Sequence, residues 1–147
     1  MEVHLCTVHC TATENGEEVS ISAIEKDHIS RGFGGIGYHI IIQPDGTKIT
    51  TRPLNQVGAH VKGSNTGNIG IALAGTDRFT YNQFLSLYSV LEMLRISFSL
   101  KPEMIFCHHE FQSAKDQGKT CPSIRAVDLV VWYMSQMNST AIDKYLI

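Results

Sequence analysis

Segments that lie far apart in the sequence carry side chains suited to binding a metal ion. A short apolar run, residues 104–107, ends in the pair His108-His109, and a polar, glycine-containing loop follows and ends at Cys121. Imidazole nitrogen and thiolate sulfur are ligands that zinc prefers, but a catalytic zinc normally has three protein ligands and one position open to solvent. The best candidate for a further ligand is His9, near the end of the first apolar run. These residues predict a catalytic zinc site.

The composition is that of an ordinary globular domain. The chain has 147 residues, of which 43% are hydrophobic and 18% are charged, and its net charge is -2. This length fits one domain, residues 1–147, with a core of its own. The small negative charge provides no basic field for nucleic acid. No apolar run is long enough to span a bilayer, so we expect no membrane insertion.

The start of the sequence and its cysteines indicate a chain made in the cytoplasm. No basic segment followed by a long apolar stretch begins the sequence, so we expect no signal peptide. Cysteines in such a chain are expected to be free or metal-bound, not disulfide-bonded. The four cysteines are Cys6, Cys10, Cys107 and Cys121.

Side chains alternate along the predicted strand 5–11, and this alternation separates His9 from the cysteines near it. Successive residues of a strand point to opposite faces of the sheet. His9 therefore lies on the opposite face from Cys6 and Cys10. We expect Cys10 to be a packed core thiol, and Cys107 has the same wrong parity for joining the metal site. No fourth protein ligand is then available, which favours a catalytic site over a structural one.

Hydrophobic patterns and turn signals predict an α/β domain with a mixed central sheet flanked by about three helices. Strands are expected at residues 5–11, 38–42, 48–52, 68–75 and 104–107, with the second and third paired as a hairpin. Helices are expected at residues 22–31, 80–97 and 123–137. Capping boxes predict the start of the first two helices, at Ser22-Glu25 and Thr80-Gln83.

The core-facing side of the two later helices follows from apolar residues at helical spacing. In the helix at 80–97, this stripe comprises Phe84, Leu87, Leu91 and Leu94. The last helix is expected to be capped by Ser123. Its predicted core stripe comprises Ile124, Val127, Val130, Val131 and Met134.

Seven short segments, spread from residue 8 to residue 122, form a longer pattern. They read VHCTAT at 8–13, GIGYH at 35–39, DGT at 45–47, VGAH at 57–60, NIGI at 68–71, HHE at 108–110 and KTCP at 119–122. In this order they resemble the zinc-dependent N-acetylmuramoyl-L-alanine amidases of the type-2 class, which share a fold with the peptidoglycan recognition proteins. The chain is most similar to the small phage-lysozyme-type members. One such segment alone is a weak signal, but the full set in order is specific.

The resemblance implies roles for individual residues. The positions of the family's zinc ligands, which hold one Zn2+ per chain, fall at His9, His108 and Cys121. Tyr38 and Lys119 fall where phage-type members keep two residues needed for catalysis, and His60 falls at a position that lines the substrate groove. The family cleaves the amide between the lactyl group of N-acetylmuramic acid and the first L-alanine of the stem peptide. The implied partner is therefore bacterial peptidoglycan.

The chemistry implied by this family suits the residues at these positions. Bound zinc can lower the pKa of its water to about 7 and polarise the scissile carbonyl. Lys119 lies two residues before Cys121, close enough to reach the developing oxyanion. Tyr38 begins a predicted strand and can direct its hydroxyl at either the water or the carbonyl, and the sequence leaves both possibilities open.

The sequence departs from the family pattern in two places. Some relatives have a glutamate that can act as general base on the strand corresponding to residues 68–75, where this chain has Ala72 and Ala74. The base is then either Tyr38 or the zinc hydroxide itself. The loop 109–121 is also longer than in the compact phage type, and we expect residues 112–117 to shape one wall of the groove.

The expected function is that of a monomeric zinc amidase that degrades peptidoglycan as a phage or prophage endolysin. It would be made in the host cytoplasm and act on the wall in the periplasm. Two alternatives stay open, a peptidoglycan-binding module without catalysis and a host amidase that recycles muropeptides. Of the remaining histidines, His4 and His28 are expected to be structural, and His109 structural or supporting a ligand.

Overall fold

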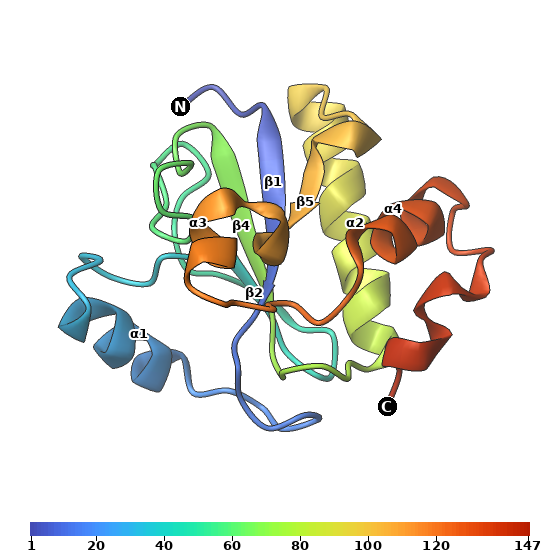
Figure 1. The fold of residues 1–147 in the computed structure, drawn as a ribbon, viewed down its shortest axis with the longest axis horizontal. Helices are drawn as coiled ribbons and strands as arrows, with labels where there is room; N and C mark the ends of the chain where they lie inside the picture. The colour runs from blue at the N-terminus through green and yellow to red at the C-terminus, as the bar shows by residue number, and fades with distance from the viewer.

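The central sheet in the computed structural model of residues 1–147 has five strands in the order β3-β2-β4-β1-β5 (Figure 1). The strands are β1 (Leu5–Cys10), β2 (Ile40–Ile42), β3 (Lys48–Thr50), β4 (Asn68–Leu73) and β5 (Ile105–Cys107). All pairs are parallel except β2 with β3, which form the predicted hairpin. The mixed α/β sheet and its five strands are therefore confirmed, although all five strands are shorter than predicted.

The two faces of the sheet belong to two different hydrophobic clusters. The register of β1 against β4 places His9 beside Ala72. One face, which includes Val8 and Cys10, joins the main hydrophobic core beneath α2 (Tyr81–Phe98) and α4 (Ala126–Met134). The other face holds Ala72 in a smaller cluster against α1 (Ile21–Ser30). Because side chains alternate along a strand, His9 belongs to this second face.

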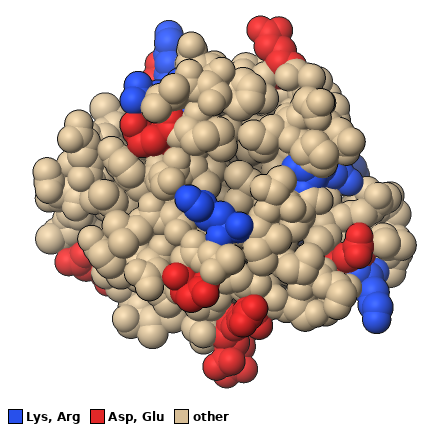
Figure 2. Space-filling view, turned by 180° about the vertical axis from the view of Figure 1, so that it is seen from behind, with Lys and Arg blue, Asp and Glu red and all other residues tan.

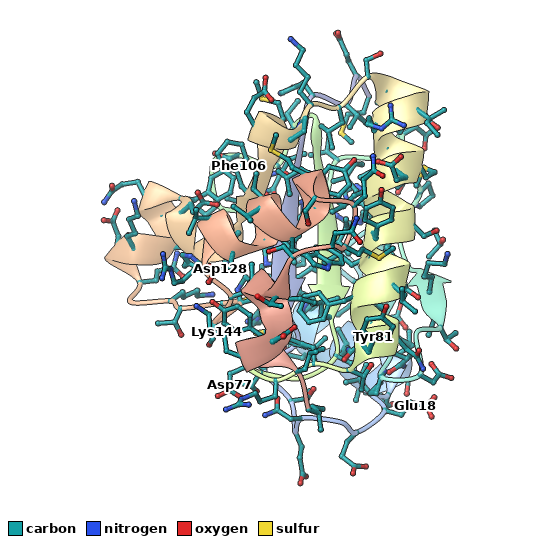
Figure 3. All side chains as sticks on the ribbon, turned by 90° about the vertical axis from the view of Figure 1, so that its right-hand side faces the viewer. Glu18, Asp77, Tyr81, Phe106, Asp128 and Lys144 are labelled. Carbon is teal, nitrogen blue, oxygen red and sulfur yellow. The ribbon has the colours of Figure 1, made fainter.

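Helix α2 begins where the sequence predicts. The Thr80 hydroxyl accepts from the backbone N–H of Gln83 at 3.1 Å, and the Gln83 side chain accepts from the backbone N–H of Thr80 at 2.9 Å. The Gln83 amide also donates to the carbonyl of Ala74 at 2.8 Å, which ties the helix to the sheet. The predicted core stripe is fully buried in its entirety. In Figure 3, the strands lie between α2 and the segment around α3 (Gln112–Asp116).

Helix α1 begins earlier than predicted. Its N-cap is Ser20, whose hydroxyl accepts from the backbone N–H of Ala23 at 3.2 Å, so the predicted capping box at Ser22 is wrong. The earlier start includes Ile21 in the helix, and Ile21 and Ile24 pack against the smaller cluster. Burial of this apolar residue therefore outweighs the local capping signal.

Helix α4 differs from the prediction in start, end and orientation. It begins after Arg125, so Ser123 is not its cap, and it ends at Met134. Much of the predicted stripe is wrong, because Val127, Val131 and Met134 are 52%, 47% and 64% exposed. The buried residues of α4 are Leu129, Trp132 and Tyr133. The Trp132 ring packs edge-on against Phe84 at 5.4 Å, and this large aromatic surface determines which side of the helix faces the core.

The C-terminal tail, which the sequence left unassigned, supports α4. Residues Thr140–Tyr145 form the 3-10 helix η3, and the Tyr145 hydroxyl accepts from the backbone N–H of Arg125 at the start of α4. Tyr145 also donates to Asp128, whose carboxylate lies 2.9 Å from the ammonium of Lys144. Asp128 and Lys144 are labelled side by side in Figure 3. These contacts hold η3 against α4, and Ile142 and Tyr145 of η3 are part of the main core.

Short helical segments surround the histidine pair. The 3-10 helices η1 (Pro102–Met104) and η2 (His108–Glu110) flank β5, and α3 follows η2 directly. The sequence predicted a loop for α3. His108 and His109 lie in the tight turn η2 and not on a strand, so strand parity does not govern where their side chains point.

The face shown in Figure 2 has no large area of one charge. Its Lys, Arg, Asp and Glu side chains form small groups within a mostly uncharged surface, and groups of opposite sign are adjacent in places. None of the helices combines the length and the apolar character needed to cross a bilayer.

Candidate metal centre

The three predicted ligands converge at one point of the structure. The ligand atoms of His9, His108 and Cys121 lie within 4.8 Å of one another. His9 is at the C-terminal end of β1 and His108 follows β5, its parallel neighbour, so the two strands deliver them to the same edge of the sheet. The two imidazole rings are 4.5 Å apart between centroids. Both histidines are buried, and Cys121 is half-buried.

The loop after His108 is folded so that Cys121 returns to the strand ends. His109 holds this return: its backbone N–H donates to the carbonyl of Cys121 at 2.9 Å, and its Nδ1–H donates to the carbonyl of Pro122 at 3.0 Å. The backbone N–H of Lys119 donates to the carbonyl of Ala114 at 2.9 Å, which anchors the loop on α3. His109 thus has a structural task, as expected.

Cys10 contacts Cys121 from the core side of β1. Its backbone N–H donates to the sulfur of Cys121 at 3.1 Å. Such a bond to sulfur stabilises the thiolate form that binds a metal. The Cys10 side chain is buried in the main core, consistent with the expected packed thiol.

The protonation of the three ligands fits zinc. Burial, followed by the charge of Lys119, lowers the pKa of His108 to about 4. Burial, and then the neighbouring His60, lowers the pKa of His9 well below its ordinary value. Both rings are therefore neutral at pH 7, the form in which imidazole binds a metal. The side chain of Cys10, together with burial, raises the pKa of the Cys121 thiol more than the backbone N–H of Cys10 lowers it, so metal binding displaces the thiol proton.

A groove opens over these ligands. It has a volume of about 790 Å³, which is in the range of small-molecule sites. Four parts of the chain line it: the end of β1, helix α1 with the residues after it, the loop around His60, and the return loop 117–121. Of residues 112–117, which were expected to shape one wall of the groove, only Gln117 lines it, and α3 contacts the return loop through the carbonyl of Ala114.

Tyr38 and Lys119 both line this groove. The Tyr38 ring lies 5.1 Å from the rings of His9 and His28, and its hydroxyl has no partner within the protein. Burial raises the pKa of Tyr38 above its ordinary value, so the phenol keeps its proton at neutral pH. Lys119 is exposed in the return loop and forms no ion pair within the chain.

His60 lies on the opposite wall and touches His9. One ring nitrogen, Nδ1, is 3.0 Å from Nε2 of His9, and the other, Nε2, is 3.0 Å from the carbonyl of Asn68. His60 is 9% exposed and is one of the residues that line the groove. Because both nitrogens are engaged within the protein, only its carbon edge faces the groove.

His28, which the sequence predicts to be structural, also lines the groove. It is 4% exposed on α1, and its Nδ1 accepts from the backbone N–H of Gly37 at 2.9 Å. A backbone N–H can only donate, so the proton of the neutral ring is on Nε2. His28 both holds the turn before Tyr38 and lines the groove. The pattern His28-x9-Tyr38 in the sequence gives no sign of this pairing.

Comparison with known proteins agrees with this geometry. Residues 1–124 match the family model described as N-acetylmuramoyl-L-alanine amidase. The chain belongs to this amidase family.

The relatives of this amidase family include phage endolysins. The chain is 35% identical over 133 residues to an endolysin of Enterobacteria phage K11, covering 85% of this chain and 82% of that protein. It is 34% identical over 134 residues to an endolysin of Escherichia phage T7, with 86% and 82% covered. Among solved structures, the N-acetylmuramoyl-L-alanine amidase LysC from Clostridium intestinale URNW is similar, with a TM-score of 0.73, 29% identity, and 82% and 76% of the two chains covered.

The amidase fold is also that of recognition proteins. Peptidoglycan recognition protein-LE, solved in complex with tracheal cytotoxin, has a TM-score of 0.70 at 24% identity, covering 82% of this chain and 74% of that one. This likeness bears on the fold alone.

The amidase groove lacks a carboxylate beside the ligands. Ala72 is fully buried on β4 next to His9 and offers no carboxylate. Among the residues that line the groove only Asp27 carries a carboxylate, and it lies 3.6 Å from the guanidinium of Arg31 on α1. A general base of the glutamate type is therefore absent from the β4 side of the site.

Proposed function

We propose that this member of the family is a zinc-dependent N-acetylmuramoyl-L-alanine amidase that holds one Zn2+ through His9, His108 and Cys121. It cleaves the amide between N-acetylmuramic acid and the first L-alanine of peptidoglycan and acts as a phage or prophage endolysin. The observation that carries the proposal is the convergence of two neutral imidazoles and one thiol, within 4.8 Å, at the base of a groove. Three protein ligands with open space beside them match a catalytic site.

The bound ion supplies a Lewis acid for the scissile carbonyl and an activated water for attack on it. The chain's own residues must orient the amide, stabilise charge on its oxygen and manage protons. Tyr38 suits the second task, because its hydroxyl is free in the groove and its raised pKa keeps it protonated. We assign Tyr38 as a hydrogen-bond donor to the developing oxyanion and not as the general base.

Lys119 supplies the positive charge of the site. Its ammonium is near enough for its charge to lower the pKa of both histidine ligands, after the larger effect of burial and, for His9, of the neighbouring histidines. It forms no ion pair that would neutralise it. A cation at this place stabilises negative charge that develops on the carbonyl oxygen during attack.

The groove is the proposed binding site for the peptidoglycan substrate. His60 lines one wall, and its carbon edge offers an apolar surface to a sugar or peptide segment. We propose that the amidase binds peptidoglycan as a monomer and meets it in the periplasm of a Gram-negative host.

The experiment that tests this proposal is hydrolysis of purified Gram-negative sacculi by the wild-type protein, with and without a chelator. We expect release of stem peptides, loss of that release after chelation, and its recovery with added zinc. Cys121→Ala should lose both zinc and activity. Cys107→Ala is the control, because Cys107 is also a free cysteine but lies outside the ligand cluster.

The same assay separates the endolysin from a recycling amidase. An endolysin cleaves intact sacculi, whereas a recycling amidase releases peptide only from soluble muropeptides. Full zinc content and full activity in Cys121→Ala would show that the proposed ligand set is incorrect.

A further inference from the structure

We propose that His60 is a positioning residue that fixes the ring orientation and tautomer of the zinc ligand His9, so that His9 binds the metal through Nδ1. The inference rests on the proposed zinc site. It assigns His60 a task beyond lining the groove, and it predicts which atom of His9 is the ligand.

The carbonyl beside His60 has only one possible role in a hydrogen bond. The backbone carbonyl of Asn68 can only accept a hydrogen bond, and it lies 3.0 Å from Nε2 of His60. The proton of the neutral His60 ring is therefore on Nε2, and its Nδ1 is an acceptor. This Nδ1 lies 3.0 Å from Nε2 of His9. His9 must then donate from Nε2, which leaves its Nδ1 lone pair as the only one free for a metal.

His60 is itself held firmly, as a positioning residue must be. The side-chain oxygen of Asn65 accepts from the backbone N–H groups of His60 and Val61, both at 2.8 Å. A Cβ atom at Gly70 would come within 2.7 Å of the His60 ring, and one at Gly58 within 2.6 Å. These two glycines therefore make the space that lets the ring lie flat against β4, in reach of His9.

A chain of hydrogen bonds connects β4 to the metal site through His60. Asn68 is fully buried at the start of β4, where its side chain accepts from Thr7 at 2.9 Å and donates to the carbonyl of Ser64 at 2.7 Å. The rigid strand thus fixes His60, and His60 fixes His9. A partner on the second nitrogen of a metal-binding imidazole sets its tautomer and raises its basicity.

The chain offers a matched control for His60. His39 is also fully buried, with Nδ1 accepting from the backbone N–H of Gly70 at 3.0 Å and Nε2–H donating to the carbonyl of Gln56 at 2.9 Å. It has the same tautomer and the same number of hydrogen bonds, but it contacts no metal ligand. Its ring packs edge-on against His60 at 5.7 Å, so replacing it tests the cost of losing a buried histidine beside His60 while the hydrogen bond between His60 and His9 is kept.

The first experiment compares three variants by zinc competition with a chromophoric chelator and by the visible spectrum of the Co(II)-loaded protein. In His60→Leu, zinc affinity should fall by about 10- to 100-fold and the Co(II) spectrum should change. His60→Asn keeps an acceptor near the place of Nδ1 and should recover most of that loss. His39→Leu should lose stability but keep the wild-type affinity and spectrum.

The second experiment measures the tautomers directly in the zinc-loaded wild-type protein by 15N NMR of the imidazoles. We expect His9 to be metal-bound at Nδ1 and protonated at Nε2, and His60 to be protonated at Nε2. Zinc on Nε2 of His9 would overturn the proposal, as would a folded His60→Leu with wild-type affinity. If His60→Leu does not fold, the NMR result and His60→Asn decide. A wild-type protein that binds no zinc would instead refute the proposed function.

Discussion

Tyr38→Phe isolates the contribution of one hydroxyl group to catalysis. The Tyr38 ring packs between His9 and His28, each at 5.1 Å, and phenylalanine preserves these contacts. The hydroxyl has no partner within the protein, so its removal leaves no buried group unsatisfied. The free energy of unfolding should therefore change by no more than about 0.5 kcal/mol, and zinc content should stay the same.

The expected effect of Tyr38→Phe is confined to the chemical step. Removing one donor to the oxyanion costs about 10²–10³ in kcat, or about 2.7–4 kcal/mol of transition-state stabilisation. The assay is the initial rate of peptide release from a purified soluble muropeptide, followed by chromatography over a range of substrate concentrations. A hydroxyl that acts only in the transition state lowers kcat and kcat/KM together.

Two results would refute the assignment of Tyr38. A kcat within about threefold of wild type would show that the hydroxyl takes no part in the chemical step. A raised KM with unchanged kcat would show that it only binds the ground state. A loss of zinc from the phenylalanine variant would mean instead that the ring supports the ligands.

Three further predictions concern other parts of the molecule. Lys119→Met should lower kcat by about 10²–10³ at unchanged zinc content. The control variant Lys115→Met, on the exposed side of α3, should leave the rate unchanged. Equal rates in the two variants would contradict the role of Lys119. Thr80→Ala should lower the free energy of unfolding in urea by about 1–2 kcal/mol, because it removes the cap of α2; an unchanged urea midpoint would argue against that cap. Burial lowers the pKa of His39 below the ordinary 6.5, so the unfolded chain binds more protons and stability falls as the pH falls below about 6.5. In chelated protein, His39→Leu should reduce that slope by up to about 1.4 kcal/mol per pH unit, and an unchanged slope would contradict the buried neutral state.

The sheet and the convergence of the three candidate ligands could be predicted because the ends of strands can be located from local apolar runs. His9 and His108 each end an apolar run, and parallel strands bring such ends to one edge of a sheet. The start of α2 was predictable for the same reason, since a capping box lies within four residues. Such features depend on sequence spacing more than on tertiary packing.

The orientation of α4 and the supporting contacts of the site could not be predicted because they depend on distant partners. Val131 and Trp132 are adjacent in the sequence, and only the packing of Trp132 on Phe84 determines that Val131 faces outward. In the same way, the role of His60 depends on the carbonyl of Asn68 and on the space left at Gly70. Backbone acceptors carry no sequence signal, so tertiary context decides them.

The central claim is that two histidines and one cysteine hold a catalytic zinc, and X-ray absorption at the zinc edge of the loaded wild-type protein tests it most directly. We expect one zinc per chain, with one sulfur at about 2.3 Å and two imidazole nitrogens at about 2.0–2.1 Å, and a fourth light atom from solvent. A shell without sulfur, or one closed by a fourth protein ligand, would contradict the account.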